Sequence, residues 1–251
     1  MKIGFSTGSL ALADVRRGVQ MALQSYADAI ELSALREEEL KPLIDALDEI
    51  DVSRFSYVSL HAPSRLQRLS EQQVVDLLQK AANRGWSIVV HPDVISTFSI
   101  WETLEDKLCL ENMDKRKTVG RTASELRNYF RQLPLAKFCF DIGHARQIDP
   151  TMLEAWQMLR EFGDRLGLVH MSYVNSSSRH EPLNFESKLA FQRVVQMIAQ
   201  DIPIILETPV RDGMLDREMQ IAESVFNGHN CYEEAVLWDS RESREVPPIG
   251  V

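Results

Sequence analysis

The sequence lacks several features that would place it in a specialised class of protein. Its 251 residues include three cysteines, Cys109, Cys139 and Cys231, which are too widely spaced for a disulfide framework. No apolar run approaches the roughly 18 residues of a membrane span. The first residues, MKIGFSTGSL, lack the apolar core and cleavage site of a signal peptide. These absences predict a cytoplasmic protein with buried thiols and no membrane partner.

Basic residues are also scarce. The chain has 28 Lys and Arg residues against 37 Asp and Glu residues, which gives a formal net charge of −9. A general nucleic-acid binder would usually present a basic face, so we expect no such binding. A local cationic pocket for a small anion remains compatible with this charge. The hydrophobic content of 44% and charged content of 26% are those of an ordinary globular protein.

Short apolar segments that end in a polar residue recur eight times. They are residues 3–8, 29–33, 57–63, 87–93, 108–114, 138–144, 168–173 and 204–210. Most of them are separated by segments with the apolar spacing of an amphipathic helix. These segments are residues 14–26, 37–49, 71–83, 122–132, 151–164, 187–200 and 216–226. A weaker helical pattern surrounds Trp101.

Helix start signals support several of these segments. Ser70 with Gln73, and Thr122 with Glu125, have the spacing of a capping box, while Asp149 precedes a proline at an expected first turn.

Eight buried strands that alternate with helices predict an α/β fold, a single (β/α)8 TIM barrel with its active site at the carboxyl ends of the strands. We assign the barrel to residues 1–227. Residues 228–251, which have no clear period and include His229, are expected to form a C-terminal tail packed on the barrel.

Carboxylates and imidazoles gather at the predicted strand ends. In chain order they are Glu31, His61, His91, Glu111, Asp141 with His144, His170 and Glu207. A fifth of the six histidines, His180, follows the seventh strand. A barrel brings these side chains together, where the carboxylates would repel one another. Divalent cations such as Zn²⁺, Mn²⁺, Fe²⁺ or Co²⁺ prefer these ligands and would balance the charge.

In these residues the chain resembles the xylose-isomerase-like TIM-barrel superfamily, which includes apurinic endonuclease IV and many sugar-phosphate isomerases and epimerases. The four positions shared across that superfamily fall on Glu111, Asp141, His170 and Glu207. The Glu111-Asn112 pair, the D-x-x-H spacing of Asp141 to His144 and the Glu207-Thr208 pair carry the resemblance.

The endonuclease branch adds histidines after the third and fourth strands, which correspond to His61 and His91. The resemblance therefore implies two divalent metal ions, Zn, Mn or Fe, that share Glu111. The first would be held by His61, His91 and Glu111, and the second by Glu111, Asp141, His170 and Glu207. A third ion would use His144 and His180, but Ser178 replaces the aspartate that the endonuclease supplies. The centre would therefore hold two ions only, or a third one weakly.

Loop residues near these strand ends are candidate substrate contacts. The run DKRKTVGR, residues 114–121, is either a solvated helix start or a cationic segment that holds an anionic group over the metals. Arginine suits bidentate recognition of phosphate or carboxylate. The substrate-binding candidates are Arg116, Arg146, Arg179, Arg211, His180 and Glu31, with Arg179 favoured because it precedes His180. Glu31 could instead cap its own loop, and His180 could instead be a metal ligand.

Two kinds of reaction remain open. Two divalent ions that share a carboxylate can stabilise the attacking and leaving oxygens of a displacement, which favours hydrolysis of a phosphoester or similar polar bond in a small sugar-type or phosphorylated substrate. Glu111, Glu207 and His144 are the candidate catalytic residues. The alternative is a sugar or sugar-phosphate isomerase or epimerase in which Glu111 and Glu207 transfer the proton. A non-catalytic metal-binding barrel is a third possibility. DNA repair is disfavoured by the acidic charge.

Overall fold

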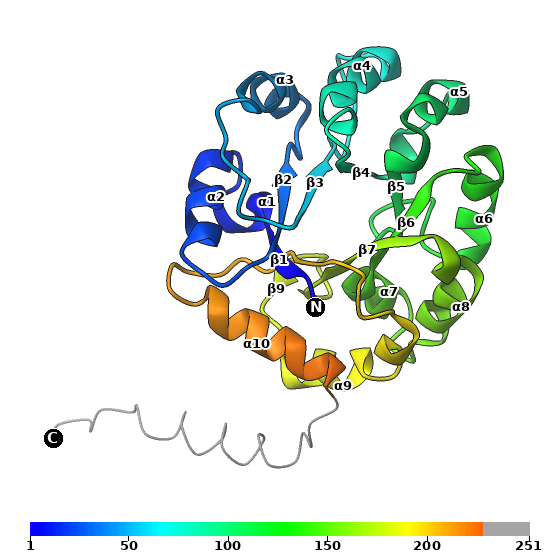
Figure 1. Ribbon diagram of the computed structural model, residues 1–251. Coiled ribbons are helices and arrows are strands. Elements are labelled where there is room, and N and C mark those ends of the chain that lie inside the picture. The colour runs from blue at the N-terminus through cyan, green and yellow to red at the C-terminus, as the bar shows by residue number, and fades with distance from the viewer. Residues whose placement is uncertain (228–251) are drawn as a thin grey trace, which may run out of the picture.

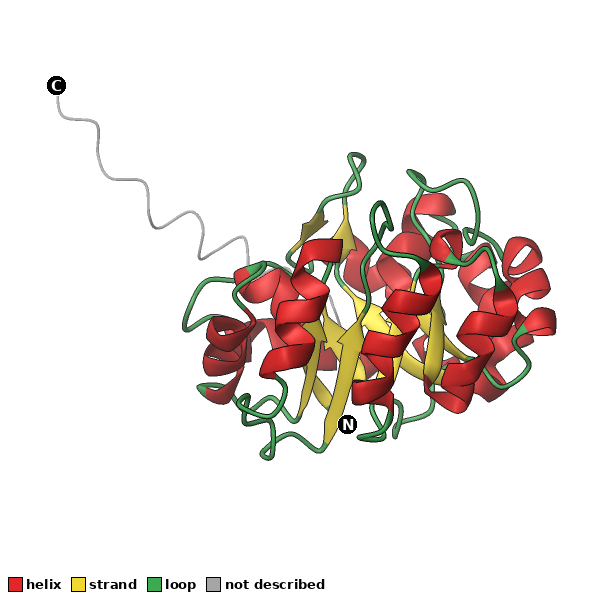
Figure 2. Ribbon diagram, turned by 90° about the horizontal axis from the view of Figure 1, so that it is seen from above, coloured by secondary structure: helices red, strands yellow, loops and turns green. Residues whose placement is uncertain are grey.

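The barrel is closed and parallel. The computed structural model describes residues 1–227, and Figures 1 and 2 show its strands enclosed by helices. The strands are β1 (Ile3–Ser6), β2 (Ala29–Ser33), β3 (Tyr57–His61), β4 (Ser87–Val90), β5 (Leu108–Glu111), β6 (Lys137–Asp141), β7 (Leu166–Met171) and β10 (Ile204–Leu206). They pair in the order β1-β10-β7-β6-β5-β4-β3-β2, so that β1 closes the barrel against β2. The predicted TIM-barrel fold is confirmed, and each of the eight strands overlaps its predicted segment, with β6 beginning one residue and β7 two residues earlier than predicted.

The helices follow the strands around the outside of the barrel (Figure 1). They are α1 (Thr7–Ala11), α2 (Val15–Leu23), α3 (Glu37–Ala46), α4 (Glu71–Ala82), α5 (Phe98–Trp101), α6 (Ala123–Gln132), α7 (Ile142–Ile148), α8 (Leu153–Phe162), α9 (Phe185–Phe191) and α10 (Leu215–Phe226). Six of the seven predicted helical segments coincide with one such helix to within three residues at each end. The seventh, residues 187–200, is interrupted: α9 ends at Phe191 and a 3₁₀ turn follows at Val195–Met197.

Three local elements depart from the sequence-based expectation. The short helices α1 and α7 start directly after β1 and β6, where we predicted no helix. A two-stranded antiparallel hairpin, β8 (Tyr173–Val174) and β9 (His180–Glu181), follows β7. All three form at the carboxyl ends of strands, so they shape the face where an active site of this fold lies.

The predicted helix caps are mostly confirmed. Ser70 forms a capping box with Gln73, and Thr122 accepts a hydrogen bond from the backbone N–H of Glu125. The prediction for Asp149 was wrong. Its carboxylate accepts from the backbone N–H groups of Thr151 and Glu154, but α8 begins only at Leu153, after a left-handed Met152 with φ of 65°.

Successive side chains of each strand point to opposite faces of the sheet, and this produces two separate apolar layers. One side of each strand packs under the helices, through residues such as Phe5, Ile30 and Leu60. The other side fills the barrel interior with a second cluster: Ala29, Val89, Cys109, Cys139, Leu168 and Ile205. Because side chains alternate with a period of two, the inward-facing residues two positions further on are Glu31, His91, Glu111, Asp141, His170 and Glu207. The strand pattern therefore places the polar set at one end of the barrel interior.

Strands β1 and β2 approach each other so closely that only a glycine fits at position 4. A Cβ atom added to Gly4 of β1 would lie 1.6 Å from the carbonyl oxygen of Ala29 in β2. A larger residue there would push β1 away from β2, where the barrel closes.

Some expectations fall outside the described residues. The C-terminal tail, with His229 and Cys231, is among them. Cys109 and Cys139 are free and buried, as predicted. Within residues 1–227, no helix has both the length and the apolar character needed to cross a membrane.

Candidate metal centre

Glu111 lies at the centre of the polar set. This buried side chain ends β5, and its Oε2 atom lies 3.2 Å from Nε2 of His61 and 3.2 Å from Nε2 of His91. Its other oxygen, Oε1, lies 3.3 Å from Nδ1 of His144 and 3.7 Å from Nδ1 of His170. The two oxygens of one carboxylate therefore face two different groups of imidazoles.

Two overlapping groups of side chains have the spacing of metal ligands. In each group every residue offers one ligand atom, and these atoms lie within 4.8 Å of one another. The groups are His61, Glu111 and His170, and Glu111, Asp141, His170 and Glu207. Residues far apart in sequence thus converge as predicted. His91 contacts the same carboxylate but lies outside both groups.

Backbone carbonyls fix the proton positions on two of the imidazoles. Nδ1 of His61 lies 2.8 Å from the carbonyl oxygen of Ala62, and Nδ1 of His144 lies 2.9 Å from that of Asn112. A carbonyl oxygen only accepts, so each Nδ1 must carry a proton. In the neutral ring Nε2 is then free to act as a ligand, and in His61 that atom faces Glu111.

Several buried polar atoms of the site have no hydrogen-bond partner among the described residues. They are Oε1 of Glu31, Nδ1 of His91, Oδ2 of Asp141, Nε2 of His144 and Nδ1 of His170. Leaving such atoms unsatisfied is costly, on the order of 1–3 kcal/mol each. Several unpartnered nitrogen and oxygen atoms around shared carboxylates fit one or more divalent cations.

The electrostatics of the site show the same need for positive charge. Burial opposes the charged imidazoles, but Glu111 and the neighbouring carboxylates raise the pKa of His61 to about 9 and that of His144 to about 10. Burial raises the pKa of Asp141 to about 7. Despite its own burial, Glu111 has a pKa well below the usual value because imidazoles surround it. Protons on His61 and His144 thus balance part of the carboxylate charge when no cation does.

The D-x-x-H spacing has a local structural reason. Oδ1 of Asp141 accepts the backbone N–H of His144 at 2.6 Å and so caps the first turn of α7. Asn112, the residue directly after β5, binds the backbone of Asp141: it donates to the carbonyl oxygen and accepts from the N–H, at 2.8 Å each. Only the other oxygen of Asp141, Oδ2, is left for the centre of the site.

A cavity of about 320 Å³ opens over these residues. The chemistry-bearing residues in its wall are His61, His91, Glu111, His144, His180 and Glu207. His180 and Glu207 have partly accessible side chains, 26% and 13% exposed, and Nδ1 of His180 lies 3.4 Å from Oε2 of Glu207. Nδ1 of His180 also lies 2.8 Å from the hydroxyl of Ser172, a contact that the sequence-based prediction missed. No sequence pattern indicated this contact, because β8 and β9 were not expected.

The expected substrate-binding arginines do not all reach this cavity. Arg116 lines it and donates to Asp114, with Nε 2.7 Å from Oδ2. Arg146 instead pairs with Glu186 and stacks on Tyr173. Arg179 and Arg211 are exposed and do not line the cavity. Arg146 lies in α7, Arg179 in the turn between β8 and β9, and Arg211 in the segment after β10, and none of the three lines the cavity.

Of two further candidates, Lys117 lies at the cavity, as the cationic interpretation of residues 114–121 predicts, whereas Glu31 does not. Lys117, in the same run as Arg116, lines the cavity, and its Nζ binds Asp93 at 2.7 Å and the carbonyl oxygen of Ser64 at 3.0 Å. Glu31 is fully buried beside His170 and does not line the cavity. A substrate in the cavity would therefore meet Lys117 and not Glu31.

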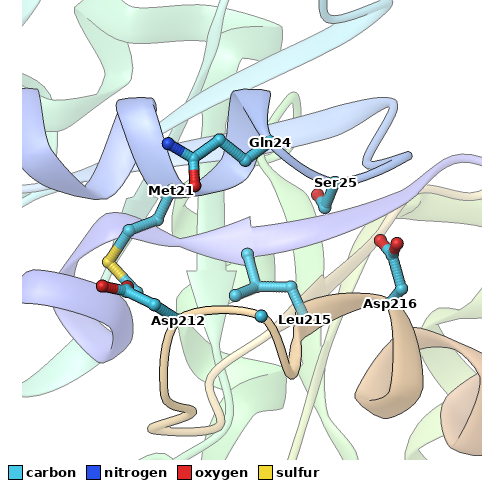
Figure 3. Close-up of a pocket in the computed structure, with 7 residues that line it drawn as sticks. Met21, Gln24, Ser25, Asp212, Leu215 and Asp216 are labelled. Carbon is cyan, nitrogen blue, oxygen red and sulfur yellow. The ribbon is translucent and has the colours of Figure 1, made fainter.

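A second, smaller hollow lies away from the strand ends. It measures about 90 Å³ and is formed by residues of α2, the segment after it and the start of α10 (Figure 3). Its two carboxylates have partners, since Asp216 accepts the backbone N–H of Tyr26 and Asp212 pairs with Arg17. Its wall contains no histidine or cysteine, so we assign no site to it.

Comparisons with known proteins agree with this architecture. Residues 16–226 match the profile of the family described as xylose isomerase-like TIM barrel. Endonuclease IV from Thermus thermophilus is 19% identical with a TM-score of 0.58, covering 91% of this chain and all of that one. The 3-keto-D-glucoside 4-epimerase YcjR from E. coli is 16% identical with a TM-score of 0.55, covering 90% of this chain and 98% of that one.

A xylose isomerase domain protein from Alicyclobacillus acidocaldarius is 12% identical with a TM-score of 0.57, and the alignment covers 90% of this chain and 98% of that one. No curated protein sequence matches the chain. At these identities the structural likeness shows the fold alone. The profile match, which spans most of the chain, shows the family: the protein belongs to the xylose isomerase-like TIM-barrel family.

Proposed function

We propose that the protein is a divalent-metal-dependent enzyme that hydrolyses a phosphoester or similar polar bond in a small substrate, at a centre that holds two cations. The observation that carries this proposal is the orientation of Glu111. Its Oε2 faces His61 and His91, and its Oε1 faces His144 and His170. A carboxylate with ligands on both sides is suited to bridge two ions.

The donor sets follow from this arrangement. His61, His91 and Glu111 would hold one ion, and Glu111, Asp141, His170 and Glu207 the other. Their nitrogen and oxygen donors suit Zn²⁺, Mn²⁺ or Fe²⁺. The ions would supply Lewis-acid stabilisation of the negative charge on the attacking and leaving oxygens. His144 and His180 could hold a third ion only weakly, because Ser178 offers a hydroxyl where the endonuclease pattern has a carboxylate.

Side chains of the cavity wall can move the protons of the reaction. His180 and Glu207 touch each other at the edge of the cavity, where both are partly accessible. One of this pair can take a proton from the attacking water, and the other can give one to the leaving oxygen. His144 lies beside them, with its ring centroid 5.3 Å from that of His180, and provides a further proton carrier.

The cavity is suited to a small polar molecule. A volume of about 320 Å³ is at the lower end of the range for small-molecule sites. The hydroxyls of Ser6, Ser9 and Ser64 line it and can bind sugar-type hydroxyl groups. Arg116 and Lys117 line the cavity, and their positive charges can bind a phosphate group of the substrate. The net charge of −9 argues against nucleic acid as a general partner.

An isomerase or epimerase is the second candidate, because Glu111 and Glu207 both line the cavity. A sugar bound between them could lose a proton to one carboxylate and regain it from the other. A binding protein without catalysis is disfavoured, since the same cavity leaves Glu207 and His180 accessible to water.

A substrate panel separates these candidates. Purified protein supplied with Zn²⁺ or Mn²⁺ is assayed against phosphomonoesters and phosphodiesters, and against sugars in deuterated water. The proposal expects ester hydrolysis that falls at least 100-fold in Glu111→Gln, as expected for loss of an essential catalytic group. Deuterium incorporation into a sugar carbon, with no ester hydrolysis, would overturn the proposal in favour of the isomerase.

A further inference from the structure

Glu31 is a buried carboxylate that the proposed reaction does not use. It lies in β2, faces the barrel interior and is fully buried. A buried carboxylate is costly unless other groups compensate it. Two groups do so here: Oε2 of Glu31 lies 3.1 Å from Nε2 of His170 and accepts the hydroxyl of Ser59 at 3.0 Å. The contact with His170 joins residues 139 positions apart in the sequence.

This contact determines where His170 carries a proton. An ionised carboxylate only accepts hydrogen bonds, so Nε2 of His170 must be the donor. The opposite nitrogen, Nδ1, is buried without a hydrogen-bond partner among the described residues and lies 3.7 Å from Oε1 of Glu111 and 3.5 Å from Oε1 of Glu207. The ring is therefore turned with its free nitrogen toward the centre of the site.

We infer that Glu31 is a positioning residue: its carboxylate holds the proton on Nε2 of His170 and so presents Nδ1 as a ligand atom. His61 and His144 achieve a similar selection through backbone carbonyls, which no substitution removes. His170 depends on a side chain, so its orientation can be tested. The role as a metal ligand rests on the proposed function, whereas the proton on Nε2 does not.

Two substitutions isolate the contact. Glu31→Gln keeps the size of the side chain but adds an amide N–H, which can donate to Nε2 and allow the proton to move to Nδ1. Ser59→Ala is the matched control, because it removes a hydrogen bond to the same oxygen without changing any group that touches His170. Thermal unfolding of both variants shows whether each retains the fold.

Two measurements give the outcome. The first is ¹⁵N-resolved NMR of the His170 imidazole in metal-free protein. A proton bound to Nε2 is expected in wild type and in Ser59→Ala, and its signal should shift or disappear in Glu31→Gln. The second is Zn²⁺ binding to metal-free protein by calorimetry. We expect affinity about 10- to 100-fold weaker in Glu31→Gln and close to wild type in Ser59→Ala.

The results separate this inference from the proposed function. A wild-type spectrum without a proton on Nε2, or an unchanged spectrum and Zn²⁺ affinity in a folded Glu31→Gln, would overturn the role of Glu31. Wild-type protein that binds no Zn²⁺ would overturn the proposed function, and the NMR comparison would still decide the contact. If Glu31→Gln does not fold, Glu31→Asp replaces it. That variant keeps the charge but withdraws it from Nε2, so intermediate Zn²⁺ affinity is expected and wild-type affinity would overturn the inference.

Discussion

Asp141 and His144 are joined by a hydrogen bond of 2.6 Å from the backbone N–H of His144 to Oδ1 of Asp141. The same carboxylate thus has two tasks. Oδ1 starts α7, and Oδ2, buried without a partner among the described residues, faces the ligand groups of the site. The start of α7 after β6 and the candidate metal centre therefore share this one side chain.

The two tasks can be separated by substitution. Asp141→Asn keeps an oxygen that can cap α7 but loses the charge, so we expect the free energy of unfolding of metal-free protein to change little while metal affinity falls. Asp141→Ala loses the cap as well and should cost about 1 kcal/mol more. Urea unfolding and Zn²⁺ titration of both variants test this. Equal metal affinity in Asp141→Asn and wild type would contradict the assigned ligand.

Removing metal should destabilise the protein. A ligand that binds only the folded state at about 100 times its Kd stabilises it by about 2.7 kcal/mol. We therefore expect a chelator to lower the Tm of metal-loaded wild-type protein. The chelator should leave the Tm of Glu111→Gln almost unchanged, because that variant loses the shared ligand. The same decrease in both proteins would place the stabilising metal elsewhere.

Arg116 should contribute to the binding of an anionic substrate. Because it lines the cavity, Arg116→Ala should raise KM for a phosphorylated substrate about tenfold, the effect of one charged hydrogen bond. Arg211→Ala is the control, since Arg211 is exposed and does not line the cavity. Steady-state kinetics of the two variants give the KM values that test this prediction. If Arg211→Ala raised KM more than Arg116→Ala does, the anion would bind at the loop after β10 and not at Arg116.

Glu71 gives the stability of the barrel a pH dependence away from the site. Burial tends to raise its pKa, but hydrogen bonds from the backbone of Thr97 and Ser96 and from the indole of Trp101 lower it below the usual value. The ionised Glu71 carboxylate therefore stabilises the folded protein at pH values above its pKa in the unfolded chain, about 4.3. This stabilisation is lost as the pH falls through the lower pKa that Glu71 has in the folded protein.

Glu71→Gln should consequently be less stable than wild type by about 1 kcal/mol at pH 7. This difference should shrink below about pH 4, where the wild-type carboxylate takes up a proton. Urea unfolding at both pH values measures it, with Glu102→Gln as a nearby control. If the difference in the free energy of unfolding between the two proteins were the same at both pH values, the charge of Glu71 would not contribute to stability.

The barrel and its ring of polar residues follow from local sequence pattern, which explains why they could be predicted. Short buried strands end in polar residues, and a period of two puts residues such as Cys109 and Glu111 on the same inner side. Asp149 shows the limit of local signals. Its carboxylate caps a turn before α8, and the helix starts later because Met152 adopts a left-handed conformation.

Tertiary contacts determine what the sequence could not show. Glu31 has the strand-end position of a substrate contact, yet its partner is His170, far away in the sequence. Arg146 was expected in a loop as an anion clamp, but it lies in α7, where it pairs with Glu186 and stacks on Tyr173. Such partners meet only after the barrel closes, and no spacing in the sequence encodes their contacts.

The central claim is that Glu111 joins two cation sites, one of which depends on His61 and His91. The most direct test is metal content per chain by elemental mass spectrometry, on wild type, His61→Ala and His91→Ala purified without chelator. We predict two equivalents of Zn, Mn or Fe in wild type and about one fewer in each variant. One equivalent in all three proteins would contradict the claim and would favour the isomerase.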